Sequence, residues 1–241
     1  MLKKLNAEDV LFIDVETVPQ YELFEDMPER FQKLWEKKAQ FLTKEDETPA
    51  DIYQRAGIYS EFGKIICISA GFIVQKEGER QFRVKSYYGD DEKQVLSEFN
   101  NMLTRFMSSP RKRVCGHNAL EFDIPYIARR TVINGLELPN ILDIAGAKPW
   151  EIKDIFLDTM QLWKFGDYKH YTSLDLLCAI FNIPTPKDDI DGSEVAAVYY
   201  QENDLDRIAR YCEKDVFATA QLLLRYKRKP LIPQENYLVA P

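Results

Sequence analysis

The segment VLFIDVETVP, residues 10–19, is the feature that most constrains how this chain can fold. Its run of large apolar side chains predicts a short buried strand. Two carboxylates, Asp14 and Glu16, stand at the end of that run, although acidic residues are depleted in strands and a buried carboxylate is costly unless it is paired or binds a cation. Either the strand ends at Asp14 and both acids are solvated, or something positively charged lies beside them.

Two further segments place acids or a tyrosine at defined positions. If the first strand continues through Glu16, its two-residue period puts both carboxylates on one face. In GHNALEFD, residues 116–123, a short predicted strand passes into a predicted helix over 123–134, so Asp123 lies at the junction. In RYCEKDVFATAQLLL, Tyr211 and Asp215 are four residues apart on a predicted helix, and both therefore project from the same side.

Each of these fragments is weak by itself. The spacing of Asp-x-Glu recurs at Asp90 and Glu92 in what reads as a solvated turn, and Tyr-x-x-x-Asp recurs at Tyr200 and Asp204. Asp123 could simply cap the helix that follows it. Their joint context gives them weight, because the first pair ends a buried strand, Asp123 follows a second strand, and the tyrosine and its acid lie early in the last long helix.

Together these segments resemble the three exonuclease motifs of the DEDD superfamily of 3′–5′ exonucleases, in its tyrosine subclass. The matching patterns are Asp14-x-Glu16, Asn118-x-x-x-Phe122-Asp123 and Tyr211-x-x-x-Asp215. The segment CGHNALEFDIPYIARR is most similar to the proofreading exonuclease domain of family-B DNA polymerases, and the resemblance covers roughly residues 8–228. It implies an α/β, ribonuclease H-like fold, with a central mixed sheet flanked by helices. The chain departs from the pattern by a helical insertion at about residues 20–62, and 241 residues leave no room for polymerase fingers, palm and thumb. It therefore resembles a stand-alone exonuclease.

The resemblance also implies the roles of individual residues. The catalytic set would be Asp14, Glu16, Asp123, Tyr211 and Asp215, and its four acids would bind two Mg²⁺ or Mn²⁺ ions. Substrate would be contacted by Thr17, Val18, Asn118 and Phe122. An ordinary phenol has a pKa of about 10, so we expect Tyr211 to position the attacking water more than to deprotonate it. Phe122 either packs beneath the site or stacks on a base, and packing is the favoured interpretation.

The implied activity is metal-dependent 3′–5′ exodeoxyribonuclease action on single-stranded DNA, with a two-metal-ion mechanism and release of 5′-mononucleotides. Two alternatives stay open: a 3′–5′ exoribonuclease, and a catalytically weak nucleic-acid-binding subunit. Retention of all four acids and the tyrosine argues against the second alternative. Candidates for phosphate contacts, each equally well explained as solvated surface, are Lys169, His170, Arg129 and Arg130. His117 is expected to be a structural hydrogen-bonding residue rather than a ligand.

Composition limits the partners and the compartment. The net charge is -7, so binding to nucleic acid requires a local basic strip or bound metal ions to offset the protein's own field. The four cysteines are far apart and lie among apolar residues, which predicts buried thiols in a reducing cytoplasm. No apolar run is long enough to span a bilayer and no signal peptide is recognisable. We therefore expect one domain over residues 1–241, cytoplasmic and without membrane contact.

Two local predictions concern irregular parts of the chain. In the insertion, a helix is expected over residues 28–43 and a second helix is expected to start at Thr48-Pro49. The pair would bury Phe31, Trp35 and Phe41, or alternatively serve as a lid over the strand or a docking surface for a protein partner. Residues 155–162 are expected to form another strand.

Overall fold

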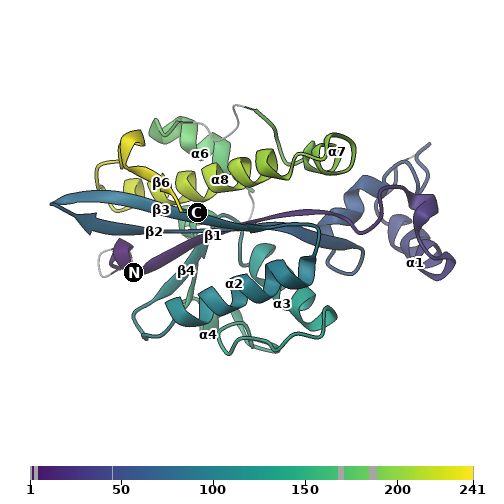
Figure 1. The fold of residues 1–241 in the computed structure, drawn as a ribbon, viewed down its shortest axis with the longest axis horizontal. Coiled ribbons are helices and arrows are strands. Elements are labelled where there is room, and N and C mark those ends of the chain that lie inside the picture. The colour runs from purple at the N-terminus through teal and green to yellow at the C-terminus, as the bar shows by residue number, and fades with distance from the viewer. Residues whose placement is uncertain (1, 3–4, 45, 168–170, 185–188, 241) are drawn as a thin grey trace.

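The computed structural model describes every residue except 1, 3–4, 45, 168–170, 185–188 and 241. Its centre is a six-stranded sheet with the strand order β5-β4-β1-β2-β3-β6 (Figure 1). The strands are β1 (Val10–Pro19), β2 (Gly63–Lys76), β3 (Glu79–Tyr88), β4 (Arg113–Gly116), β5 (Phe156–Asp158) and β6 (Tyr237–Val239). β1 pairs antiparallel with β2, and β2 with β3, whereas β4 lies parallel to β1, β5 to β4 and β6 to β3. The sheet is therefore mixed, as expected.

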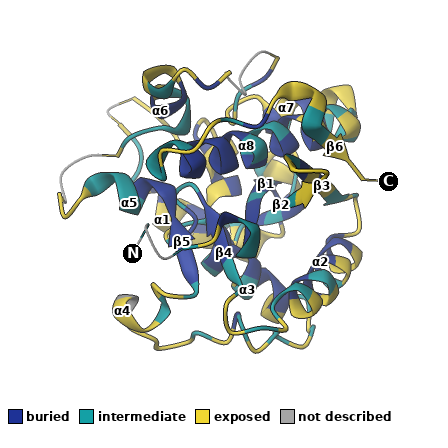
Figure 2. Cartoon of the chain, turned by 90° about the vertical axis from the view of Figure 1, so that its left-hand side faces the viewer, coloured by how far each residue is buried: buried dark blue, intermediate teal, exposed yellow. Residues whose placement is uncertain are grey.

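Helices cover both faces of the sheet (Figure 1). On one side lie α6 (Leu174–Phe181), α7 (Val195–Ala197) and α8 (Leu205–Tyr226), and on the other lie α2 (Glu92–Phe106), α3 (Asp123–Ile133) and α4 (Pro149–Ile152). Figure 2 shows the buried residues concentrated in the strands and in α8, whereas α4 is mostly exposed. This arrangement is the α/β architecture that the resemblance implied, and it is consistent with a ribonuclease H-like exonuclease fold. No helix in the described ranges is both long and apolar enough to cross a membrane.

The alternation of β1 decides where its two acids point. Leu11, Ile13 and Val15 belong to the hydrophobic core that includes residues of α2 and α3. Phe12 belongs to the second core, which α8 closes on the opposite face of the sheet. Because side chains alternate along a strand, Asp14 lies on the same face as Phe12, toward α8.

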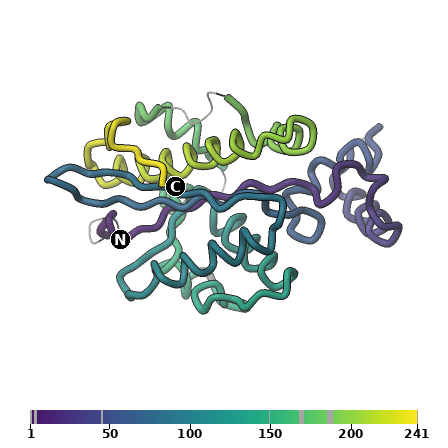
Figure 3. Tube along the Cα trace, in the orientation of Figure 1, coloured from purple at the N-terminus to yellow at the C-terminus, as the bar shows by residue number. Residues whose placement is uncertain are grey.

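The insertion forms a lobe beyond the end of β1 (Figure 3). It contains α1 (Glu29–Ala39) and a 3-10 helix, Tyr53–Ile58. Trp35 is fully buried in the lobe's own small core, and its ring contacts the ring of Tyr53 at 5.8 Å between centroids. The lobe is fixed to the main body where the Tyr126 hydroxyl of α3 donates to the Gly57 carbonyl oxygen at 2.8 Å.

Two expectations about the insertion were wrong. The second α-helix does not form at Thr48-Pro49, because the chain turns there and the Trp35 indole takes the Pro49 carbonyl as its hydrogen-bond acceptor at 2.8 Å. Of the three aromatic side chains expected to be buried, only Trp35 is, since Phe31 is 40% exposed and Phe41 is 87% exposed. The buried residues of α1 are Trp35 and Ala39, which lie one turn apart on the same face of the helix. The positions on either side of that face lie at the surface.

Candidate active site

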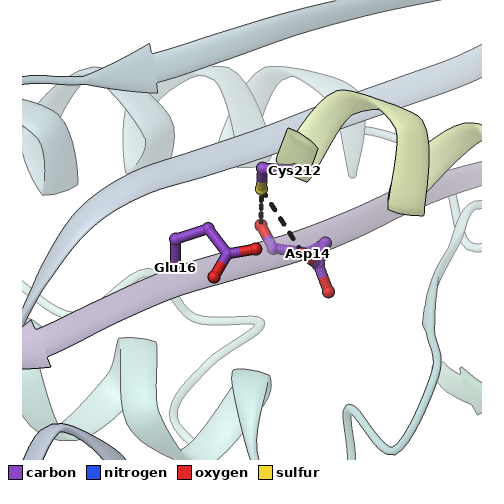
Figure 4. A group of neighbouring side chains, drawn as sticks. All are labelled: Asp14, Glu16 and Cys212. Atoms are coloured by element: carbon purple, nitrogen blue, oxygen red, sulfur yellow. Dashed lines mark hydrogen bonds between the residues drawn. The ribbon is translucent and has the colours of Figure 1, made fainter. Parts of the chain in front are cut away.

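Asp14 and Glu16 lie side by side because β1 continues through both residues. Its register pairs Asp14 with Ser69 and Glu16 with Cys67 on β2. A third side chain joins them from α8: the Cys212 thiol donates to the backbone oxygen and to Oδ2 of Asp14, both at 3.4 Å (Figure 4). The ligand atoms of Asp14, Glu16 and Cys212 all lie within 4.8 Å of one another. The strand therefore holds two carboxylates together on the face that α8 covers.

Tyr211 and Asp215 come from α8, one helical turn apart, and a side-chain hydrogen bond joins them. Tyr211 is buried. Burial, and then the nearby charge of Asp215, raises the pKa of the Tyr211 hydroxyl far above its ordinary value. The hydroxyl is consequently protonated at neutral pH, and it can act as a hydrogen-bond donor.

Asp123 is the first residue of α3, at the loop–helix junction predicted from the sequence. It is only 3% exposed. Burial raises the pKa of its carboxyl to about 7, and the charges of Asp158 and Asp215 act in the same direction. Backbone hydrogen bonds from Asp123 itself and from Val15 oppose that rise. The bond from Val15 places the Asp123 carboxyl beside β1, at the residue that separates Asp14 from Glu16 in the sequence.

The four acids share one electrostatic environment. Burial is the largest cause that raises the pKa of both Asp14 and Glu16 well above ordinary values. The next contribution for Asp14 comes from Asp123, and for Glu16 from Asp215. Asp123 and Asp215 do not belong to the group of Asp14, Glu16 and Cys212, whose ligand atoms lie within 4.8 Å of one another. The four acids are therefore spread around a region wider than one ligand cluster. Such an excess of buried negative charge favours a bound cation.

The four residues predicted to contact substrate have different surroundings. Asn118 has a left-handed backbone, with φ 64°, and its Oδ1 is buried with no hydrogen-bond partner in the part of the chain that the structure describes. Phe122 packs against the core and against the Tyr126 ring, at 5.3 Å between centroids, which favours the packing interpretation. Val18 is fully buried, and Thr17 forms a side-chain hydrogen bond with Tyr126.

Asp158 is a residue whose importance the sequence did not reveal. It is buried at the end of β5, where Oδ1 accepts from the backbone N–H groups of Asn118 at 3.1 Å, Met160 at 2.9 Å and Gln161 at 3.2 Å. Oδ2 accepts from the Leu120 N–H at 3.1 Å. The expectation of a strand over 155–162 was therefore wrong beyond Asp158, because this carboxylate caps α5 (Thr159–Lys164). An acid followed by Thr159 after an apolar run is an N-cap signal that could have been recognised.

Cys212 was predicted only as a buried thiol. The structure bears that out for all four cysteines, which are buried and free. Nothing in the spacing of the sequence marks Cys212 as a neighbour of Asp14, because 198 positions separate the two residues. Its contact with the acids comes from the packing of α8 across β1.

The basic residues proposed as phosphate contacts and His117 fall into four groups. His117 has the structural role expected: its Nδ1 lies 2.9 Å from Thr159 Oγ1, and its Nε2 donates to the Thr172 carbonyl oxygen at 2.9 Å. Arg130 cannot contact phosphate as predicted, because it is buried in an ion pair with Glu92. Arg129 is exposed. Lys169 and His170 lie outside the described residues.

The fold and this site define a ribonuclease H-like protein with an acidic cluster of the kind that binds divalent cations. The chain belongs to the family of predicted 3′–5′ exonucleases related to the exonuclease domain of PolB, whose model matches residues 58–235. That family is one of nucleases. The match begins after β1, so Asp14 and Glu16 are placed in the site by the structure alone.

A curated relative has a compatible description. A DNA polymerase of Pyrococcus glycovorans is 25% identical to this chain over 146 residues, which is 54% of the chain. The chain spans only 18% of the length of that polymerase. The likeness therefore concerns one part of the larger protein.

Proposed function

We propose that this protein is a metal-dependent 3′–5′ exodeoxyribonuclease that removes 5′-mononucleotides from the 3′ end of single-stranded DNA. The observation that carries the proposal is the meeting of four carboxylates from β1, α3 and α8 in a member of a predicted 3′–5′ exonuclease family. There burial, together with the charges of Asp123 and Asp215, raises the pKa of both Asp14 and Glu16. Hydrolysis of a phosphodiester requires the neutralisation of charge on the phosphate, and the acids are suited to hold the ions that neutralise it.

The donor set fits Mg²⁺ or Mn²⁺. Hard cations of this kind prefer carboxylate oxygens together with water and phosphate oxygens. The ions would be held by Asp14, Glu16, Asp123 and Asp215. The neighbouring Cys212 thiol is neutral, because burial raises its pKa well above the ordinary value, so it adds no charge to the set. When bound, two such ions supply positive charge to both oxygens of the displacement and lower the pKa of a water molecule.

The protein's own groups would orient the reactants. The Tyr211 hydroxyl, protonated and one turn from Asp215, would donate or accept a hydrogen bond that positions the attacking water. The unpartnered Oδ1 of Asn118 would accept a hydrogen bond from a hydroxyl of the terminal sugar. Val18, whose side chain is buried, would offer backbone atoms only. We propose a single-stranded 3′ end because unpairing a base from a duplex costs a few kcal/mol.

The test is digestion of 5′-labelled single-stranded DNA and RNA of one sequence, with Mg²⁺, with Mn²⁺ and with EDTA. Asp14→Asn is the inactivating variant. Asp143→Asn is its matched control, because Asp143 is an exposed carboxylate in the loop before α4. We expect a ladder that shortens from the 3′ end, that EDTA and Asp14→Asn abolish, and that Asp143→Asn leaves unchanged.

The same experiment separates the alternatives. Faster shortening of RNA would make the protein an exoribonuclease, which distinguishes its substrate by contacts to the 2′-hydroxyl. Intact label in every lane, with strand binding retained, would refute catalysis and favour a nucleic-acid-binding subunit. A wild-type rate in Asp14→Asn would overturn the assignment of the acids.

A further inference from the structure

A tyrosine outside the three motifs lies in a segment that is hydrogen-bonded to the loop of the second motif. Tyr171 lies in the segment between α5 and α6 and is 69% exposed. A single exposed aromatic side chain is common on protein surfaces and by itself indicates nothing. Two further observations connect this ring to the site.

The backbone beside Tyr171 is anchored to the loop that carries the second motif. The carbonyl oxygen of Thr172 accepts a hydrogen bond from His117 Nε2 at 2.9 Å. His117 directly precedes Asn118, whose N–H is in turn bound by Asp158. The Tyr171 segment is therefore bonded to the loop that carries Asn118 and leads to Asp123.

The hydroxyl of Tyr171 also lies within the field of the acids. Partial desolvation raises the pKa of this hydroxyl above its ordinary value. The next contributions come from three carboxylates of the site and its support: Asp123, Asp158 and Asp215. Tyr171 belongs to neither α3 nor α8, so the segment before α6 also contributes a side chain that is sensitive to the charges of these acids. The phenol is neutral at physiological pH and does not repel phosphate.

We propose that Tyr171 is a nucleic-acid contact whose ring stacks on a base at the 3′ end of the strand. The inference rests on the proposed function, because it takes the scissile phosphodiester to lie at the carboxylates. The Tyr171 side chain is exposed, and its neighbour Thr172 is bonded to His117, which adjoins the proposed sugar contact Asn118, so the ring is within reach of the terminal bases. Stacking on an aromatic ring is tolerant of sequence, because every base has a π-face, and this suits an enzyme that removes nucleotides one after another.

The experiment measures binding without cleavage. Fluorescence anisotropy of a labelled single strand is recorded with Mg²⁺ in the Asp14→Asn background, alone and combined with Tyr171→Ala or Tyr171→Phe. Trp150→Ala is the matched control, since Trp150 is similarly exposed, at 61%, but lies on α4 at the opposite face of the sheet from α8. We expect Tyr171→Ala to weaken the Kd about tenfold. Tyr171→Phe, which keeps the ring, and Trp150→Ala should stay within about twofold of the background Kd.

A second probe distinguishes stacking from a structural role. A strand that lacks its last bases, with abasic sugars in their place, should bind the background protein about tenfold more weakly than the intact strand. The Tyr171→Ala protein should bind the intact strand and the abasic strand with equal Kd, because it lacks the ring on which the terminal base would stack. A Kd unchanged by Tyr171→Ala, or an undiminished preference for the intact strand in that variant, would overturn the proposal.

Failure of this inference is distinguishable from failure of the proposed function. If the wild-type protein shortens labelled DNA but Tyr171→Ala binds normally, only the stacking proposal is refuted. If the wild-type protein has no metal-dependent turnover, the exonuclease assignment is refuted, and the anisotropy comparison still decides whether Tyr171 contacts the strand.

Discussion

Replacing Asp123 with Asn should flatten the pH dependence of stability in the metal-free protein. The folded-state pKa of Asp123 is raised from its ordinary value of 3.8 to about 7, mainly by burial. A carboxyl whose pKa is raised on folding stabilises the protein while it is protonated. That stability is fully present below the unfolded-state pKa and is lost as the pH rises through the folded-state pKa.

The magnitude follows from the window between the two pKa values. Between about pH 4 and pH 7 the folded carboxyl stays protonated while the unfolded one is ionised, and each pH unit costs about 1.4 kcal/mol. From about pH 5 to about pH 8 the free energy of unfolding should therefore fall by about 3 kcal/mol through Asp123 alone. Above about pH 7 the contribution is flat. The pKa values of Asp14 and Glu16 are raised as well, so their contributions have the same sign.

The assay is urea unfolding in EDTA at several pH values, for the wild-type protein and for Asp123→Asn. The difference between the two curves cancels the titration of all other groups. Asp143→Asn should follow the wild-type curve. Added Mg²⁺ should raise the free energy of unfolding of the wild-type protein at high pH, because a ligand that binds only the folded state stabilises that state by mass action. If the free energy of unfolding changes with pH by the same amount in the wild-type protein and in Asp123→Asn, both in EDTA, the reasoning is refuted. The ionised Asp123 carboxylate would then not be destabilised by burial and like charges.

Four other outcomes are expected. Asp158→Ala should lower the free energy of unfolding by about 3 kcal/mol in urea unfolding, because it leaves buried backbone N–H groups without an acceptor. An unchanged free energy of unfolding would refute the role of Asp158 in holding these backbone segments. Tyr211→Phe should reduce kcat in the labelled-strand assay with little change in KM, whereas a changed KM alone would contradict a role in orienting water. Glu92→Gln should cost about 3–5 kcal/mol in the same unfolding assay, since it leaves the buried Arg130 charge unpaired. Lys33→Gln, in the exposed pair with Glu29, should change stability by less than about 1 kcal/mol.

The parts of the fold that were predictable depend on neighbours in the chain. Residues 64–74 and 80–88 are strand-like runs on either side of KEGE, a pattern that predicts a hairpin. The hairpin of β2 and β3 forms there, and its turn uses Glu77 and Gly78 in left-handed conformations, as a tight hairpin requires. Helix α2 begins after Asp91, which accepts from the Gln94 N–H as an N-cap. Patterns of this kind are local, so the sequence reveals them directly.

Predictions that depended on distant contacts were incomplete. The second helix of the insertion fails where the Trp35 indole takes the Pro49 carbonyl. The strand expected over 155–162 ends at Asp158, because that carboxylate binds backbone N–H groups both in α5 and in the loop after β4. Arg130 was a candidate for phosphate binding until its buried pairing with Glu92 was known.

The sequence by itself determined which chemical groups the site would contain. The period of a strand places Asp14 and Glu16 on one face, and the period of a helix places Tyr211 and Asp215 on one side. Both periods are properties of the local backbone. Only the tertiary structure decided how the groups meet: Cys212 donates to Asp14 across 198 residues, Asp158 binds the Asn118 loop, and His117 binds the backbone beside Tyr171. The physical reason is that burial and mutual repulsion of charges depend on distance in space, and the packing of α3 and α8 on β1 sets those distances.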